Sequence, residues 1–134
     1  GKVQPSDTDW SDSAKAMTVV DTLGALDIGQ GTVVQQGLVR AVEAAEGTDR
    51  MLERCCDLTK GLGGVLVKLT KPDQDHRVDL PTIGLATIEG ARAAGLNGIA
   101  VEAGAAMVME RAATIQAADA AGMFLIGVRR NSAN

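Results

Sequence analysis

Aromatic side chains are almost absent from this 134-residue chain, which has one Trp, one Phe and no Tyr. The core must therefore be built from Val, Leu, Ile, Ala and Met. The same deficit argues against a surface for single-stranded nucleic acid, because such surfaces stack bases on aromatic rings. A net charge of −4 without a basic block argues against duplex binding, which needs clustered Lys and Arg. We expect no nucleic-acid partner.

Cysteine, histidine and long apolar runs are also scarce. Cys55 and Cys56 are the only cysteines, and neighbours in a helix project in different directions. We therefore expect no intrachain disulfide, and a reducing compartment fits better than a secreted scaffold. His76 is the only histidine, so a His/Cys zinc cluster has no residues to form it. No apolar run approaches the ~20 residues of a membrane span.

The spacing of the apolar residues predicts one domain of alternating helices and strands. Gln36-Gly37 and Gly104 each suit a tight turn between two strands, which gives two hairpins. The sequence thus predicts an α/β fold with helices packed on a mixed sheet, and an apparent repeat of two hairpin-helix-strand halves. We expect helices at about residues 8–24, 48–58, within 82–94 and at 111–121, and strands at about 32–34, 38–42, 65–70, 99–101, 107–109 and 123–128.

The most informative stretch is residues 64–84, where an apolar strand runs into a charged segment bracketed by Pro72 and Pro81. Proline fixes φ and biases the preceding residue toward extended backbone, so we expect a stiff loop here. Cations close to carboxylates suit phosphate chemistry with a divalent metal, because cations neutralise phosphoryl oxygens while carboxylates hold the metal or orient a water. The charged residues of the stretch are Lys68, Lys71, Asp73, Asp75, His76, Arg77 and Asp79.

Asp79 is the first candidate for a site residue. In Arg77-Val78-Asp79 the two charged side chains share one face of an extended segment. They can serve a site, with Asp79 on a metal or an attacking water and Arg77 on a phosphate, or they can form an ordinary ion pair beside a proline turn. Lys68 and Lys71 flank the strand end, although surface lysines are usually solvated. The spacing alone leaves these alternatives open.

A second candidate is Glu46-Gly47-Thr48-Asp49, where the first hairpin enters a helix. Free N–H groups and the dipole at a helix N terminus attract anions. Glu46 and Asp49 already supply negative charge, however, so a bare phosphate would be repelled unless a metal intervened. Thr48 as the N-cap with Asp49 in the first turn explains these residues without any site.

Several stretches, in this order, resemble the C-terminal domain of one enzyme family. They are similar to the UDP-2,3-diacylglucosamine pyrophosphatases of lipid A biosynthesis, in the form used by bacteria such as alphaproteobacteria that lack the metallophosphoesterase type. The resemblance covers residues 1–128 as a catalytic C-terminal domain, followed by a loose tail at 129–134. Its motifs are residues 26–31, 41–49, 77–84, 94–99 and 102–104, with Lys68, Lys71-Pro72 and Ala118-Asp119.

The resemblance implies Mg²⁺-assisted hydrolysis of UDP-2,3-diacylglucosamine to UMP and 2,3-diacylglucosamine 1-phosphate (lipid X). Water attacks the phosphorus nearer the sugar, and the aspartate of the Arg-Val-Asp-Leu-Pro motif, here Asp79, is catalytic and orients that water. The enzyme would be a cytoplasmic homodimer, peripheral to the inner membrane. The implied substrate or phosphate ligands are Lys68, Lys71, Arg77, Gln30 and Thr48, and the implied metal ligands are Glu46, Asp49 and Asp79.

Two departures from the family pattern qualify these expectations. Family members carry Asp-Arg-Glu before the last helix, whereas this chain has Glu110-Arg111-Ala112. The N-terminal Rossmann-like domain of the family, which we expect to be a partner of this one, has no counterpart in the chain. Because the lipid product is expected to bind between the two domains, we expect the isolated domain to fold but to turn over substrate poorly. The alternatives are a non-catalytic module that binds an anion or small ligand or dimerises, and a pyrophosphatase for another nucleotide sugar.

Overall fold

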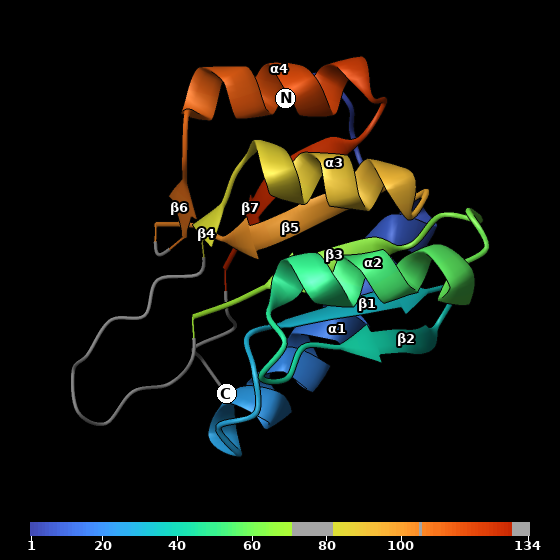
Figure 1. The fold of residues 1–134 in the computed structure, drawn as a ribbon, viewed down its shortest axis with the longest axis vertical. Helices are drawn as coiled ribbons and strands as arrows, with labels where there is room; N and C mark the ends of the chain where they lie inside the picture. The colour runs from blue at the N-terminus through green and yellow to red at the C-terminus, as the bar shows by residue number, and fades with distance from the viewer. Residues whose placement is uncertain (71–81, 105, 130–134) are drawn as a thin grey trace.

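Helices and strands alternate along the chain in the computed structural model, which describes residues 1–70, 82–104 and 106–129 (Figure 1). This order confirms the predicted α/β class. None of the helices in these ranges combines the length and apolar character needed to cross a bilayer. The elements are α1 (Asp7–Ala25), β1 (Gly31–Gln35), β2 (Leu38–Val42), α2 (Thr48–Leu58), β3 (Val65–Lys68), β4 (Thr82–Ile83), α3 (Leu85–Ala93), β5 (Gly98–Glu102), β6 (Met107–Val108), α4 (Arg111–Ala120) and β7 (Phe124–Val128).

A mixed five-stranded sheet forms the centre of the fold, in the order β2-β1-β3-β5-β7. β1 is antiparallel to both of its neighbours, whereas β3, β5 and β7 are parallel. The start of β1 therefore lies at the same sheet edge as the ends of β2, β3, β5 and β7. In Figure 1, α2, α3 and α4 cover one face of the sheet and α1 lies against the other.

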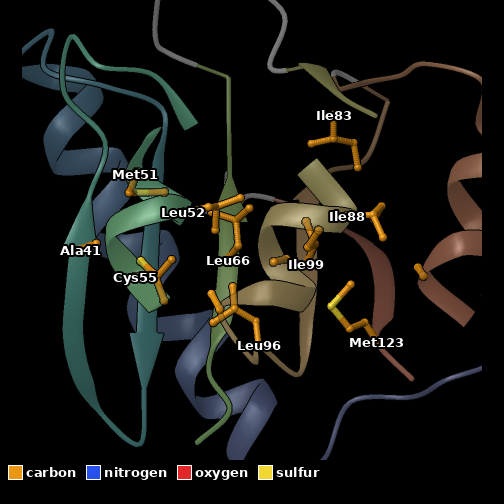
Figure 2. Packing of buried hydrophobic residues seen from close by; sticks show 14 of the residues in the cluster. Ala41, Met51, Leu52, Cys55, Leu66, Ile83, Ile88, Leu96, Ile99 and Met123 are labelled. Atoms are coloured by element: carbon orange, nitrogen blue, oxygen red, sulfur yellow. The ribbon is translucent and has the colours of Figure 1, made fainter. Parts of the chain in front are cut away.

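Each face of the sheet has its own apolar core. The side chains of a strand alternate between faces, so Leu66 points to the helices α2 and α3 while Val65 and Val67 point to α1. Burial on both faces explains why β3 is an unbroken apolar run before Lys68. The first core, shown in Figure 2, includes Met51, Leu52, Cys55, Leu66, Ile83, Ile88, Leu96, Ile99 and Met123, and the second includes Ala16, Val20, Val34, Val65, Val67, Ala100 and Phe124.

The hairpin predicted at Gln36-Gly37 is confirmed. Both residues have positive φ, 49° and 80°, as the favoured two-residue hairpin turn requires. Asp12 of α1, only 3% exposed, accepts hydrogen bonds from the backbone N–H groups of Gln36 (2.9 Å) and Gly37 (2.8 Å). A helix on the far face of the sheet thus binds the turn, a contact that the sequence did not predict.

The second predicted hairpin, around Gly104, is wrong. β5 pairs with β3 and β7 in the large sheet, whereas β6 pairs in parallel with β4 in a separate small sheet. The second half of the chain therefore does not repeat the first. The physical reason is burial, because the apolar run of β5 is covered on both faces and suits the centre of a parallel sheet.

Candidate functional site

A cleft of about 670 Å³ opens at the sheet edge where β3 ends. Ligands of open α/β sheets bind outside the carboxyl ends of the strands, which makes this cleft the first candidate site. The wall comes from the start of α2, the end of β3, β4, the start of α3 and the turn before α4. Its residues are Glu46, Gly47, Thr48, Asp49, Arg50, Lys68, Thr82, Ile83, Gly84, Leu85, Ala86, Thr87, Met109 and Glu110.

Two helices begin at this cleft with glycine as the N-cap. Gly47 precedes α2 and Gly84 precedes α3, and no side chain in the described part of the chain caps the first-turn N–H groups of either helix. Gly47 has a φ of 86°, which favours glycine. Uncapped N–H groups and the helix dipole favour an anion at such ends. Both helix N termini therefore suit a phosphate-bearing ligand in the cleft.

Lys68 is a buried cation at the floor of the cleft. It is the last residue of β3, is only 6% exposed, and donates from Nζ to the backbone carbonyl of Thr82 (3.3 Å). Burial lowers the pKa of Lys68, and the carboxylates of Glu43 and Asp49 oppose that shift. Lys68 is thus not a solvated surface lysine. Its ammonium group is held where an anion in the cleft would meet it.

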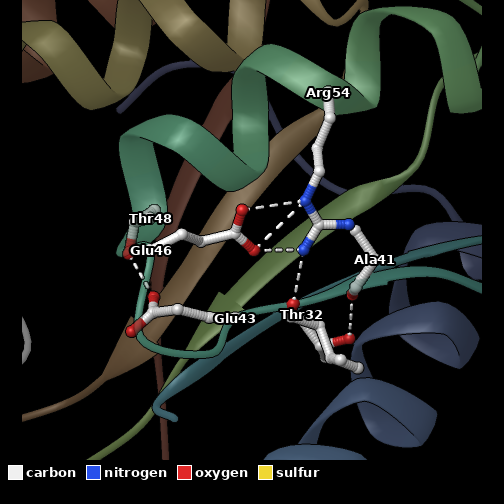
Figure 3. Close-up of polar contacts among 7 residues, drawn as sticks. Thr32, Ala41, Glu43, Glu46, Thr48 and Arg54 are labelled. Carbon is white, nitrogen blue, oxygen red and sulfur yellow. Dashed lines mark hydrogen bonds and ion pairs between the residues drawn. The ribbon is translucent and has the colours of Figure 1, made fainter.

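Thr48 is the first residue of α2, so the expectation that it is the N-cap is wrong; Gly47 holds that place. The hydroxyl of Thr48 donates to Oε2 of Glu43 instead (Figure 3). The hydroxyl of Thr48 therefore acts as a donor to a buried carboxylate, and the positive φ of Gly47 turns the chain into the helix. The sequence did not single out Glu43 as a site residue; its signals were its place in the motif at residues 41–49 and its position directly after a strand that ends at this edge.

Glu46 is engaged in an ion pair with Arg54 of α2 (Figure 3). Both carboxylate oxygens of Glu46 accept hydrogen bonds from the guanidinium, which also donates to the carbonyl of Val42 (2.8 Å). The hydrogen bonds from Arg54 lower the pKa of Glu46. Arg54 therefore partly compensates the negative charge that was expected to repel a phosphate at the start of α2. The sequence did not single out Arg54.

The remaining predicted site residues are placed as follows. Gln30 lies at the same sheet edge, where its carbonyl accepts a hydrogen bond from Leu69 N–H (3.0 Å), but it is not part of the described cleft wall. The segment that carries the other candidates joins Thr70 to Thr82, a residue of the wall. Lys71, His76, Arg77 and Asp79 lie outside the described residues, as does the tail from residue 130.

The cleft wall includes residues with carboxylate side chains, a type of ligand that binds Mg²⁺ in proteins. Across residues 1–70, 82–104 and 106–129, no three His, Cys, Asp or Glu side chains come close enough to hold a metal ion. Asp49 and Glu110 nevertheless line the cleft. One or two carboxylates together with substrate phosphates are the usual ligands of Mg²⁺, so the donor chemistry fits this ion. Asp49 fits better than Glu46, whose oxygens bind Arg54.

The fold and the cleft define an α/β domain suited to a phosphate-bearing ligand at the carboxyl edge of its sheet. The LpxI C-terminal domain model matches residues 1–126, and the chain belongs to this family. It is 53% identical over 135 residues to the UDP-2,3-diacylglucosamine pyrophosphatase LpxI of Caulobacter vibrioides, covering 96% of this chain. The chain spans about half (48%) of the length of that relative. The family indicated by the sequence motifs is thereby confirmed.

Proposed function

We propose that this domain is the catalytic half of an enzyme that hydrolyses the pyrophosphate of UDP-2,3-diacylglucosamine to UMP and lipid X. Support comes from the Caulobacter vibrioides relative, a UDP-2,3-diacylglucosamine pyrophosphatase that shares 53% identity with the chain. The structural observation that carries the proposal is the cleft in which two uncapped helix N termini and the buried Lys68 converge. A pyrophosphate is the kind of compact, multiply charged anion that such a cleft suits.

The fixed donors of the cleft would bind the phosphoryl oxygens. N–H groups in the first turns of α2 and α3 need no reorganisation when negative charge grows on the reacting phosphate, so they stabilise the transition state. Lys68, held by the Thr82 carbonyl, adds a point charge from the floor. Lys71 and Arg77 would add further cations from the adjoining segment.

Asp79 would orient the attacking water and accept its proton as the new P–O bond forms at the phosphorus nearer the sugar. UMP is then the leaving group. Asp79 stands three residues before Thr82 in the sequence, and an extended chain covers at most ~3.6 Å per residue. This short tether to a wall residue supports a role in the cleft. Mg²⁺, held by Asp49 with Asp79 as a further proposed ligand, would neutralise phosphate charge when bound.

Exposed apolar residues in the cleft wall and on the neighbouring strand β6, here called the apolar rim, suit an acylated substrate. Leu85 and Met109 line the cleft and are 42% and 55% exposed, and Met107 on β6 is 50% exposed. We assign this rim to the acyl chains. We further propose that the enzyme is a cytoplasmic homodimer peripheral to the inner membrane, and that an N-terminal domain of the family type completes the lipid site.

The experiment that tests this function is Asp79→Ala in the full-length protein. Loss of UDP-2,3-diacylglucosamine hydrolysis with substrate binding retained supports the proposal, whereas unchanged turnover supports a non-catalytic anion-binding or dimerisation module. Asp73→Ala, from the same segment, is the matched control and should retain activity. A panel of UDP-sugars with and without acyl chains separates this substrate from other nucleotide sugars.

A further inference from the structure

Glu43 is a buried carboxylate at the site edge that the proposed chemistry does not use. It is 9% exposed and follows β2, and its backbone N–H donates to the carbonyl of Gly31 (2.9 Å). Its carboxylate accepts the hydroxyl of Thr48, the residue that starts α2. This hydrogen bond therefore links the end of a strand in the sheet to the helix whose N terminus lines the cleft.

Gly31 leaves room for the carboxylate of Glu43 beside the side-chain stem of Lys68. Gly31 is the register partner of Lys68 across the β1–β3 pair. A Cβ added at Gly31 would lie 3.1 Å from Oε2 of Glu43 and 3.5 Å from Cγ of Lys68. The missing side chain thus leaves a space that the carboxylate and the lysine stem share. The negative charge of Glu43 raises the pKa of Lys68 against the lowering effect of burial.

The structure assigns to Glu43 the role of a positioning residue, which keeps Lys68 cationic and fixes the start of α2 so that the cleft can bind phosphate. This inference rests on the proposed function. Glu43 does not touch the phosphate in this account; it acts through Lys68 and Thr48.

Other ionisable groups near Lys68 come from the elements packed around it. Asp49 in α2 also raises the pKa of Lys68. The first turn of α3 supplies Leu85, Ala86 and Thr87, none of which titrates. The others are Glu46 and Arg50 near the start of α2, Glu110 before α4, and Glu102 at the end of β5, whose Oε1 accepts from Thr70 N–H (3.1 Å).

The test is the pH profile of kcat/KM for UDP-2,3-diacylglucosamine hydrolysis by the full-length protein with Glu43→Gln. Without the opposite charge Lys68 loses its proton at lower pH, so the alkaline limb should move down by about one pH unit. At pH values where Lys68 stays protonated, kcat/KM should stay within about threefold of wild type, because a repulsive charge has also been removed. A purely structural defect would lower kcat/KM at every pH.

Lys68→Arg is the matched control variant, because the guanidinium of arginine stays protonated over the whole pH range of the kcat/KM profile. In Lys68→Arg, adding Glu43→Gln should no longer move the alkaline limb. An unmoved limb in the Glu43→Gln single variant overturns the inference. If Lys68→Met also leaves hydrolysis unchanged, the phosphate-binding role of Lys68 fails. Failure of the proposed function shows differently, as absence of UDP-2,3-diacylglucosamine hydrolysis in the wild-type full-length protein, so the two failures are distinguishable.

A measurement on the unaltered protein covers the case in which Glu43→Gln does not fold. The ε-methylene NMR signal of Lys68 can be followed against pH in the full-length protein. The inference predicts a cationic Lys68 at pH 7, and a neutral amine at that pH contradicts it.

Discussion

At the scale of single residues, the buried charge of Lys68 lowers the stability of the fold, although the same charge is proposed to bind phosphate. Its ammonium is buried, and burial lowers its pKa below the ordinary 10.5. Between the lowered pKa and 10.5 the unfolded chain binds more protons than the folded one. The stability of the wild-type protein should therefore rise with pH through that window and be lower at neutral pH.

Lys68→Met tests this trade-off, because it keeps the length of the side chain and removes its charge. We expect the free energy of unfolding at pH 7 to rise, because the lowered pKa of Lys68 means that the folded protein disfavours its charge even with Glu43 and Asp49 nearby. Hydrolysis by the full-length protein should fall at least about tenfold with the loss of a phosphate contact. Urea unfolding and steady-state kinetics measure the two effects. A less stable variant with normal activity would contradict the assignment.

The two adjacent cysteines should differ sharply in reactivity. Burial raises the pKa of Cys55 to about 11, whereas Cys56 is exposed. Since the thiolate is the reactive form, a thiol reagent at pH 8 should modify one cysteine in the native protein and both in denaturant. Cys56→Ser should abolish the native reaction. Equal native rates for both thiols would mean that α2 packs differently against the core.

At the scale of elements, the β1–β2 hairpin depends on α1. The Asp12 carboxylate accepts both N–H groups of the turn, and hydrogen bonds to a charged group contribute about 1.5–3 kcal/mol. Asp12→Ala should therefore lower the free energy of unfolding by about 2 kcal/mol in urea titration. Ser11→Ala, at an exposed position of the same helix, is the control and should change it by less than about 0.5 kcal/mol. An equal effect of the two variants would show that the hydrogen bonds of Asp12 to the turn do not stabilise the fold.

The elements also show which features a sequence can predict. The first hairpin was predictable because Gln36-Gly37 determines a local turn. The partner of β6 was not, because its pairing with β4 joins segments that are distant in the chain. Lys68 was found from its place at a strand end. Glu43 and Arg54 were missed, since their contacts with Thr48 and Glu46 arise only when the strand and helix pack together.

At the scale of the whole molecule, the charged cleft and its apolar rim together suit an amphipathic substrate. Leu85→Ser and Met109→Ser should raise KM for the acylated substrate by about three- to tenfold, the loss expected for exposing part of an apolar contact. KM for a UDP-sugar without acyl chains should not change. Leu62→Ser, at an exposed site before β3, is the control. A similar rise in KM for both substrates would mean that Leu85 and Met109 do not bind the acyl chains.

The central claim is that phosphate groups bind where α2, α3 and Lys68 meet. Titration of the ¹⁵N-labelled full-length protein with UMP and with pyrophosphate tests it most directly, by amide chemical shifts. We predict saturable shifts of the amides of Thr48, Asp49, Leu85 and Ala86, which Lys68→Met weakens. Saturable binding that leaves these amides unshifted and moves signals elsewhere in the protein would contradict the account.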